Sequence, residues 1–423
     1  MKLWNGNEVL SSIYCHFRAK GVVEMSHENL KVEALDLHER LKGKLTVQSK
    51  VAVTSSKELS LVYSPGVAEP CLEIQKDPSK VYDYTMKGNL VGVVSDGSAV
   101  LGLGDIGPKA AMPVMEGKAL LLKQLAGVDA MPIVLDTKDV EEIITVVKNI
   151  APTFGAINLE DISAPRCFEI EDRLRKECDI PIFHDDQHGT AIVTAAGLQN
   201  ALKVVNKQKE NVKIVINGAG AAGVAVLKLL LIIGYKNIIA CDSKGIIYKG
   251  RSYGMNEEKE YMAKLTNLDC IEGSLEDAIA GSDIFIGVSA PNLLTEKMIQ
   301  SMNADPIVFA LANPNPEITY ENAIKWGVRV IATGRSDYPN QVNNMLAFPG
   351  IFKGALEVRA TDINDEMKMA AVQAIATLVT DEQVAKGTII PNVFEIDVTD
   401  YVAEAVMRAA IHSQVAQKAI SLI

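Results

Sequence analysis

The sequence predicts an α/β protein of two domains, each organised around a parallel β-sheet. The chain has 423 residues, which exceeds one ordinary core, since single cores stop growing at about 250–300 residues. A content of 48% hydrophobic but only 5% aromatic residues suits packing by Val, Ile, Leu and Ala. In both halves, short apolar runs alternate with helical patterns, which is typical of βαβ units.

The first half of the chain predicts a parallel βαβ series. After a helix at 26–41, strands at 89–94 and 99–103 are expected to form a hairpin. Alternating elements follow: helix 112–126, strand 130–135, helix 139–149, strand 156–159, helix 164–177 and strand 180–183. Acidic residues close three of these strands: Asp136, the pair Glu160 and Asp161, and the pair Asp185 and Asp186. Because parallel strands end at one edge of a sheet, these carboxylates are expected to gather there.

The second half predicts a doubly wound sheet of the Rossmann type. Its strands are expected at 212–216, 237–241, 284–288, 307–311 and 328–331. One helix is expected at 221–233, and another at 191–205 with Thr190 as its N-cap. After a predicted break at 348–350, helices at 366–379 and 402–415 are expected to pack back on the first half.

These patterns predict a discontinuous domain, 26–186 plus 345–423, around a second domain at 187–344. The segment 180–190 joins the two and is expected to act as a hinge. Residues 1–25 match neither pattern, and we interpret them as an N-terminal extension that is disordered or arises from an upstream start.

Charge and cysteine content restrict the partners and the compartment. A formal net charge of −11 argues against nucleic acid and against an anionic membrane as partners. No apolar run reaches the ~18–20 residues of a membrane span. The six cysteines are scattered without a C-x-x-C pair, so reduced thiols in a cytoplasm are the simplest interpretation.

A glycine-rich turn carries the pattern of a dinucleotide-binding site. Three glycines follow a predicted strand and open a helix: Gly218, Gly220 and Gly223. Asp242 ends the next strand, at the spacing of about 20 residues that this pattern requires, and is expected to bind the adenosine ribose. Because Asp242 would repel a 2′-phosphate, NAD is favoured over NADP, although Lys244 and Arg251 nearby weaken that preference. The domain at 187–344 is therefore predicted to bind NAD.

Lys118 falls on the apolar stripe of the predicted helix at 112–126, four residues after Val114. The ordinary interpretation is a lysine at the helix flank whose ammonium group reaches solvent. Its position after a glycine-rich loop and ahead of the acidic strand ends favours a functional interpretation. Burial lowers the pKa of a lysine toward neutrality, which suits a general base.

The carboxylates of Glu160, Asp161 and Asp186 would form a hard oxygen site for Mg²⁺ or Mn²⁺, with positions left for substrate and water. Single acidic pairs are mostly solvated loop ends, but two pairs at successive strand ends are a stronger indication. His184 and His188 flank the second pair and are alternative ligands, although hydrogen-bonded structural histidines are the simpler interpretation.

Seven motifs together resemble the malic enzyme family in its short bacterial form. They are Tyr63-Ser-Pro-Gly-Val-Ala, Asp96-Gly-Ser-Ala-Val-Leu-Gly-Leu-Gly-Asp105, Met112-Pro-Val-Met-Glu-Gly-Lys118, Leu159-Glu-Asp161, Phe183-His-Asp-Asp-Gln-His-Gly-Thr190, Phe309-Ala-Leu-Ala-Asn-Pro314 and Asn343-Asn344. The resemblance implies oxidative decarboxylation of L-malate to pyruvate and CO₂, with NAD and a divalent metal as cofactors. It makes the discontinuous domain the catalytic domain that binds substrate and metal.

The resemblance also implies the roles of individual residues. Lys118 would take the 2-hydroxyl proton while hydride leaves C2, and Asp185 would support this lysine. The metal ligands would be Glu160, Asp161 and Asp186.

Further roles concern the ends of the substrate. Tyr63 would protonate C3 of the enolate. Asn313 would lie near the nicotinamide, and Asn343 and Asn344 near malate. A homodimer is expected as well, in a family whose sites can borrow residues across an interface.

One departure from the family pattern concerns the substrate. The longer eukaryotic-type enzymes have an arginine where this chain has Ala99, so the cation facing the distal malate carboxylate is not identified. Two other functions stay open: a malolactic-type conversion of malate to lactate with bound NAD, and a non-catalytic NAD-binding regulator.

Overall fold

The structure is a computed structural model that describes residues 27–100, 102–394 and 397–418. The predicted extension at 1–25 lies outside these residues. The chain separates into two compact units, Met1–Thr46 and Val47–Ile423. In the first unit, helix α2 (His27–Leu41) confirms the predicted helix. Among the described residues, no helix has both the length and the apolar character that crossing a membrane requires.

Short helices lead from the start of the second unit to its first strand. They are α3 (Ser56–Val62), α4 (Ala68–Lys76), η1 (Pro78–Lys80), α5 (Val81–Tyr84) and η2 (Met86–Asn89). Ser55 caps α3 by accepting a hydrogen bond from Glu58 N at 3.2 Å. Neither α3 nor α4 buries a side chain, so apolar periodicity does not reveal them.

The first sheet has four strands in the order β2-β1-β3-β4. Its strands are β1 (Leu90–Ser95), β2 (Asp129–Val134), β3 (Ala156–Leu159) and β4 (Ile182–His184). Its connections contain α6 (Pro108–Ala126), α7 (Val140–Ile150), η3 (Ala151–Thr153) and α8 (Arg166–Glu177). All neighbouring strands are parallel, which confirms the predicted βαβ series.

The predicted hairpin of 89–94 with 99–103 is wrong. Strand β1 pairs in parallel with β2 on one side and β3 on the other, so no edge of it remains for a hairpin partner. The chain beyond β1 forms a loop with one isolated bridge, between Val100 and Gly104. Gly97, Gly102 and Gly104 have φ values of 66°, 73° and 73°, in the left-handed region that glycine enters without strain.

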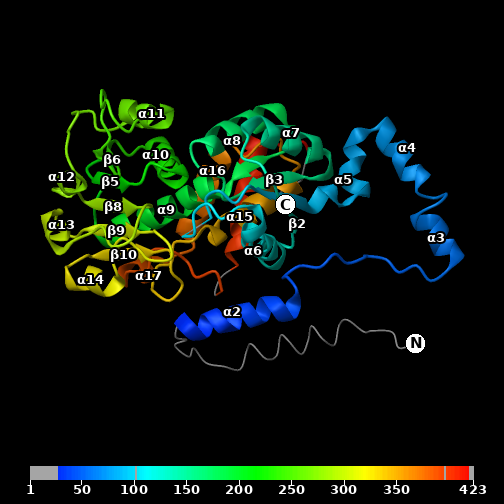
Figure 1. Cartoon of the computed structure of the whole chain (residues 1–423), viewed down its shortest axis with the longest axis horizontal. Coiled ribbons are helices and arrows are strands. Elements are labelled where there is room, and N and C mark those ends of the chain that lie inside the picture. The colour runs from blue at the N-terminus through cyan, green and yellow to red at the C-terminus, as the bar shows by residue number, and fades with distance from the viewer. Residues whose placement is uncertain (1–26, 101, 395–396, 419–423) are drawn as a thin grey trace. The chain divides into compact units, whose positions relative to one another are not determined.

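The second sheet has six strands in the order β10-β9-β8-β5-β6-β7, coloured green to yellow in Figure 1. Its strands are β5 (Lys213–Asn217), β6 (Asn237–Asp242), β7 (Gly245–Ile246), β8 (Ile284–Gly287), β9 (Ile307–Ala310) and β10 (Val330–Thr333). Its helices are α10 (Ala221–Ile233), α11 (Glu257–Leu265), α12 (Leu275–Ile279), α13 (Glu296–Ser301) and α14 (Tyr320–Lys325). Strand β7 is antiparallel to β6 and the other pairs are parallel, which confirms the Rossmann-type sheet.

Helix α9 (Asp185–Val204) connects the two sheets without a break. The prediction of Thr190 as its N-cap is wrong, because the helix begins at Asp185, after His184 in an extended conformation. Two acidic residues in its first turn are favourable at the positive end of the helix dipole. The segment expected to act as a hinge is therefore partly helical, since 185–190 belong to α9.

The chain after the second sheet is mostly helical. It contains η4 (Asn344–Leu346), α15 (Phe348–Glu357), α16 (Asp365–Thr377), α17 (Asp381–Ala385) and α18 (Val398–His412). The predicted break at 348–350 is wrong, because Pro349 occupies the first turn of α15, where its missing N–H has no helical partner in any case. Gly350 allows α18 to approach closely, since a Cβ there would lie 2.6 Å from Val402 Cβ.

These C-terminal helices pack on α6, which connects two strands of the first sheet, and on α9, which connects the two sheets. Helices α15 and α18 contact α6, and α16 and α17 contact α9. One apolar cluster contains side chains from β1, α9, α10, α15 and α18, among them Val91, Ile192, Leu227, Phe352 and Val402. The division into domains 26–186 plus 345–423 and 187–344 stays a prediction.

Candidate active site

Three carboxylates meet at the carboxyl edge of the first sheet. Glu160 and Asp161 follow β3, and Asp186 lies in the first turn of α9, after β4. One oxygen from each lies within 4.8 Å of the others. The Asp161 amide donates a hydrogen bond to Asp186 Oδ2 at 2.8 Å, and Asp161 has a φ of 53°, uncommon for a residue with a side chain. The predicted metal ligands are thus brought together, and oxygen-only donors suit Mg²⁺ or Mn²⁺.

Lys118 of α6 lies against this group. Its Nζ is 3.0 Å from Glu160 Oε1 and donates a hydrogen bond to Asp185. The lysine side chain is 11% exposed and that of Asp185 is fully buried. The ammonium group also lies 4.5 Å from the ring centroid of Phe348, a residue that the sequence indicated only as part of a break. The structure therefore supports the pairing of Lys118 with Asp185.

The charge of this group is dominated by carboxylates. Burial alone would lower the pKa of Lys118, but the charges of Asp185 and Glu160 outweigh it and raise the pKa above its ordinary value. The expected lowering of the Lys118 pKa is thus wrong for this arrangement of charges. Burial and the neighbouring carboxylates raise the pKa of Glu160 well above its ordinary value, against the opposing charge of Lys118.

Glu171 of α8 holds the start of α9 from behind, a role that no sequence pattern indicated. Its carboxylate accepts hydrogen bonds from His184 N at 3.1 Å, Gln187 Nε2 at 2.9 Å and His188 Nε2 at 2.8 Å. Burial alone would raise the pKa of Glu171, but His188 beside it lowers the pKa to about 2. His188 is thus hydrogen-bonded, as the simpler interpretation predicted, but that interpretation is wrong for His184, whose two buried ring nitrogens have no hydrogen-bond partner among the described residues. The fully buried His184 ring lies with Nδ1 3.8 Å from Asp186 Oδ2.

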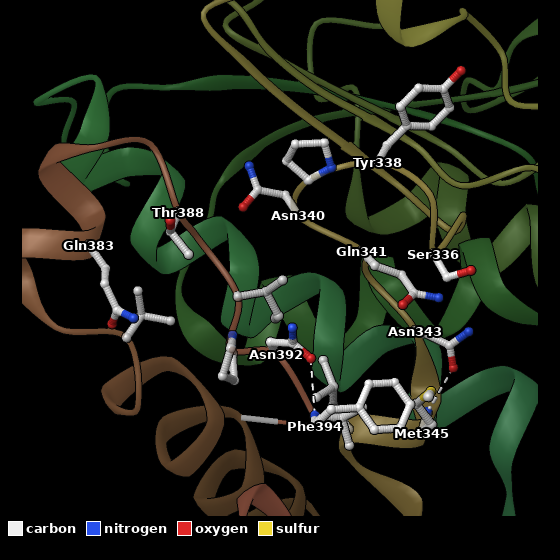
Figure 2. A pocket seen from close by; sticks show the side chains of 16 residues that line it. Ser336, Tyr338, Asn340, Gln341, Asn343, Met345, Gln383, Thr388, Asn392 and Phe394 are labelled. Atoms are coloured by element: carbon white, nitrogen blue, oxygen red, sulfur yellow. Dashed lines mark hydrogen bonds between the residues drawn. The ribbon is translucent and has the colours of Figure 1, made fainter. Parts of the chain in front are cut away.

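Asn344 lies close to the carboxylates and Asn343 lies beside a cavity. A Cβ on Gly189 would lie 3.1 Å from Asn344 Cβ and 1.9 Å from Asp185 Oδ1, so only glycine fits there. Asn343 caps η4 by accepting a hydrogen bond from Met345 N at 2.9 Å. Figure 2 shows Asn343 with Tyr338 and other residues that line this cavity of about 380 Å³.

Asn313 follows β9 and lies near the loop after β1. A Cβ on Gly102 would lie 2.9 Å from Asn313 O, and one on Gly334 would lie 2.6 Å from Asn313 Nδ2. The buried Glu317 fixes the adjoining backbone by accepting hydrogen bonds from Ser289 N and Ala312 N, both at 3.1 Å. No sequence pattern indicated this role for Glu317.

The glycine-rich turn has the shape that a dinucleotide needs. Gly218 has a φ of 127°, and a Cβ on Gly223 would lie 1.8 Å from Gly218 O, so both positions require glycine. A Cβ on Gly220 would meet no atom within 4 Å, so the turn faces open space there. Helix α10 begins at Ala221, and its amino end favours an anion.

Asp242 ends β6 as predicted, but its carboxylate is surrounded by cations. Arg251 Nη1 lies 2.9 Å from Oδ1, and Lys259 Nζ lies 2.8 Å from Oδ2. The sequence indicated Arg251 but not Lys259, which lies 17 residues after Asp242.

Two further positions were expected to concern the substrate. Tyr63 lies at the end of α3 with 68% of its surface exposed, in contrast to the buried Lys118. Beside Ala99, the position that departs from the family pattern, Arg166 Nη2 lies 3.0 Å from Ser98 Oγ, and Arg166 Nη1 lies 2.9 Å from Asp96 Oδ2.

Known proteins match both parts of the chain. The family model for the malic enzyme N-terminal domain matches residues 42–175, and that for the malic enzyme NAD-binding domain matches residues 187–411. The bifunctional malic/malolactic enzyme of Bacillus subtilis is 60% identical over 389 residues, which cover 92% of this chain and 95% of that protein. The NAD-dependent malic enzyme of Geobacillus stearothermophilus is 59% identical, with 89% of this chain and 78% of that protein covered.

More distant relatives and solved structures agree. The NADP-dependent malic enzyme of Escherichia coli is 50% identical, with 93% of this chain and 54% of that protein covered. The crystal structure of malic enzyme from Pyrococcus horikoshii matches with a TM-score of 0.88 and 48% identity, over 93% of each chain. That of the NAD-dependent malic enzyme from Thermotoga maritima has a TM-score of 0.86 and 50% identity, over 88% of this chain and 98% of that one.

Two parallel sheets, a dinucleotide turn and a buried lysine among carboxylates define the class as a two-domain α/β oxidoreductase. Within that class, the chain belongs to the malic enzyme family of NAD(P)-dependent oxidoreductases.

Proposed function

We propose that this enzyme converts L-malate to pyruvate and CO₂ with NAD as hydride acceptor and Mn²⁺ or Mg²⁺ as a second cofactor. The observation that carries the proposal is Lys118, buried between Asp185 and Glu160 beside three carboxylates suited to a metal. A proton acceptor next to a divalent metal site is what a 2-hydroxy acid requires for oxidation and decarboxylation.

The chain's own residues perform the proton transfers. Lys118 accepts the 2-hydroxyl proton of malate as hydride leaves C2, and Asp185 orients the lysine by its hydrogen bond. Asn344, against the start of α9, contributes to malate binding, and Asn343 lies next to it in the sequence. Tyr63 donates the proton that C3 of the enolate receives.

The metal would be held by Glu160, Asp161 and Asp186. Their oxygens lie close enough to share one ion. Burial, together with the neighbouring carboxylates, raises the pKa of Glu160, and a bound cation would offset the charge of those carboxylates. When bound, a divalent cation polarises the 2-oxygen and offsets the charges that raise the Lys118 pKa.

The dinucleotide would lie on the second sheet. The open space at Gly220 and the amino end of α10 fit a pyrophosphate, and Asn313 would lie near the nicotinamide. When bound, NAD accepts hydride from C2.

The direct test is a product assay with purified protein. We expect NADH and pyruvate to form at equal rates when malate, NAD and Mn²⁺ are all present, and neither to form when one of them is omitted. The malolactic alternative is favoured by one observation, the 60% identity to the bifunctional malic/malolactic enzyme of Bacillus subtilis. This alternative predicts lactate without net formation of NADH. A non-catalytic regulator would bind NAD and form no product, which would overturn the proposal.

We also propose a homodimer in which Tyr63 completes the site of a second copy of this chain. The Tyr63 side chain is 68% exposed, and α3 and α4 around it bury no side chain. Exposed apolar side chains follow the same stretch: Val47, Val51, Val53, Leu59, Leu61, Val62, Val67 and Leu72. A continuous exposed apolar stretch of this kind marks an interaction surface, and dimers with twofold symmetry are the commonest assembly.

Mixing two inactive variants tests this sharing. Tyr63→Phe and Lys118→Ala are each expected to be inactive alone, and random exchange of subunits should restore about a quarter of the normal activity. Half of the dimers would then be mixed, and each mixed dimer has one intact site of two. No recovery on mixing, with subunit exchange verified by mass, would show that Tyr63 acts within its own chain.

A cytoplasmic location is supported by Cys71, Cys167, Cys178, Cys241 and Cys270, all of which are free thiols. No nucleic acid or membrane partner is proposed for a chain of net charge −11.

A further inference from the structure

A buried carboxylate lies where β8 and β9 of the second sheet end (Figure 1). Glu317 lies between β9 and α14, and its side chain is fully buried. Its Oε1 accepts a hydrogen bond from Ser289 N, after β8, and its Oε2 accepts one from Ala312 N, after β9, both at 3.1 Å. A single side chain therefore joins the loops that follow two neighbouring parallel strands.

The partners of this carboxylate are backbone amides. Among the described residues, no cation forms an ion pair with Glu317. Burial raises the pKa of Glu317, and the hydrogen bonds from the two amides oppose that rise. A buried carboxylate without a counterion reduces stability relative to an apolar side chain of similar size. What this carboxylate provides is therefore the placement of two backbone amides.

The loop after β8 is also joined to the glycine-rich turn after β5. A Cβ on Gly287, the last residue of β8, would lie 2.4 Å from Glu317 Cδ, so the carboxyl group rests directly on the strand end. Ser289 Oγ accepts a hydrogen bond from Asn217 Nδ2 at 2.8 Å. Asn217 directly precedes Gly218, the first glycine of the turn. The contacts of Glu317 thus fix the loop after β8 beside the turn that a dinucleotide needs.

The loop after β9 leads to Asn313. Ala312, whose N–H donates to Glu317, is the residue before Asn313. A dinucleotide crosses a doubly wound sheet where the strand order reverses, which is between β5 and β8 in this chain. With the pyrophosphate at the turn after β5, the nicotinamide half faces the ends of β8 and β9. The two loops that Glu317 joins are the ones on that side.

We propose that Glu317 is the positioning residue of the nicotinamide site, and that it holds the loops after β8 and β9 at the separation that the nicotinamide ring requires. This inference rests on the proposed function, in which the dinucleotide lies on the second sheet. Because its side chain is fully buried, Glu317 acts through Ser289, Ala312 and the adjoining Asn313.

The test separates the nicotinamide ring from the rest of the cofactor. Calorimetry on the full chain measures the dissociation constants of NAD and of ADP-ribose, which lacks the ring. Glu317→Gln keeps the size of the side chain but turns one acceptor oxygen into an NH₂ donor that faces a backbone N–H. We expect the Kd for NAD to rise about tenfold and the Kd for ADP-ribose to stay within about twofold. An equal rise for both ligands, or no rise for NAD, overturns the inference.

A second variant displaces the same carboxylate without changing its charge. In Gly287→Ala the added Cβ would lie 2.4 Å from Glu317 Cδ and push the carboxyl group away. The loss of affinity should again be confined to NAD. A loss shared equally by ADP-ribose in this variant would contradict the positioning role.

Asp283→Asn is the matched control, because it removes a buried carboxylate at the opposite end of β8. Asp283 accepts hydrogen bonds from Lys207 Nζ and Lys213 N, both at 2.8 Å. This variant should lower stability and leave the ratio of the two dissociation constants unchanged. If it weakened NAD selectively as well, general destabilisation would explain the effect and the inference would be wrong.

Turnover distinguishes this inference from the proposed function. In Glu317→Gln the KM for NAD should rise, while the KM for malate should stay within about twofold. If the selective loss of NAD affinity is present while malate yields no NADH in the wild type, the positioning role stands and the proposed reaction does not. If malate yields NADH but NAD and ADP-ribose are weakened equally, the reaction stands and the positioning role does not.

Discussion

At the edge of the first sheet, Lys118 lies among the carboxylates of Glu160, Asp161, Asp185 and Asp186, whereas at the edge of the second sheet Asp242 lies between Arg251 and Lys259. Both groups are built where parallel strands end, and both are largely buried. They contain the same kinds of side chain in opposite proportion. The first has a surplus of negative charge and the second a surplus of positive charge.

The difference teaches that an acidic residue at a strand end does not by itself specify a ligand. Asp186 and Asp242 look alike in the sequence, since each follows an apolar run. The surplus of charge around each one decides whether a further cation or a further anion is favoured beside it. The following variants test whether that contrast holds.

The largest effect is expected for Lys118→Ala, which removes the single cation of the negative group. Turnover with malate should fall about 10³-fold or more, since a positioned base contributes 10²–10⁴-fold and the loss also leaves Asp185 unpaired. NAD affinity, measured by fluorescence titration, should stay within about twofold. Lys123→Ala, on the exposed part of the same helix, is the control. Unchanged turnover in Lys118→Ala would show that another group is the base.

Removing one carboxylate should reduce the affinity for the metal more than it reduces the stability of the fold. Asp186→Asn is expected to raise the Kd for Mn²⁺ about 100-fold, because a ligand and a charge are both lost. Metal-induced thermal stabilisation reports this without turnover, and a chelator should abolish it in the wild type until Mn²⁺ is restored. Asp179→Asn, at the opposite end of β4, serves as the comparison. Equal Mn²⁺ affinity in the two variants would remove Asp186 from the metal site.

In the positive group, Asp242→Asn should cost about 2 kcal/mol of stability, because it leaves Arg251 buried without a charged partner. Burial alone would raise the pKa of Asp242, but hydrogen bonds from Arg251 and Lys259 lower it from 3.8 to about 2. The stabilisation from the ionised form is therefore complete above pH 3.8 and is lost as pH falls toward 2.

The measurement is urea unfolding of the wild type and Asp242→Asn as a function of pH, with Asp269→Asn as an exposed control. The difference in unfolding free energy should be constant near neutral pH and shrink below 3.8. A difference that does not change with pH would mean that the carboxylate contributes by shape and not by charge.

The smallest effect is expected for Phe348→Leu. Its ring lies 4.5 Å from the Lys118 ammonium, and a cation–π contact of this kind contributes about 1 kcal/mol, so kcat/KM should fall about fivefold. Phe352→Leu removes an aromatic ring that packs edge-on against Phe183, and it should reduce stability with little change in kcat/KM. If Phe348→Leu reduced stability and left kcat/KM unchanged, Phe348 would be a core residue and no part of the site.

Much of the fold followed from local patterns, because strands of the first sheet such as β1 are buried on both faces and read as apolar runs. The hairpin prediction failed because pairing of β1 on both sides is decided by distant strands. The prediction of a break at Phe348 was wrong because a proline is tolerated in the first turn of a helix, where Pro349 lies.

The candidate site was predictable where motif and strand end coincide, as at Lys118 and Asp186. Glu171 and Lys259 were not, since each makes its contacts 13 or 17 residues away, at spacings that no motif marks. The direction in which the pKa of Lys118 shifts also depends on the three-dimensional contacts, because it is set by how many carboxylates converge on the ammonium group.

Helix α9 carries Asp185 and Asp186 at one end and reaches Val204 at the other, a length of about 30 Å. The match to the NAD-binding domain of the family begins at residue 187, inside this helix. A chimaera joined at that boundary would combine metal carboxylates from one parent with a helix body from another, while α10 and α16 pack along that body. Exchange of cofactor domains between relatives should therefore place its junction after Val204 and carry matching surfaces of α10 and α16. The unit to exchange as a whole is therefore helix α9 together with the faces of α10 and α16 that contact it.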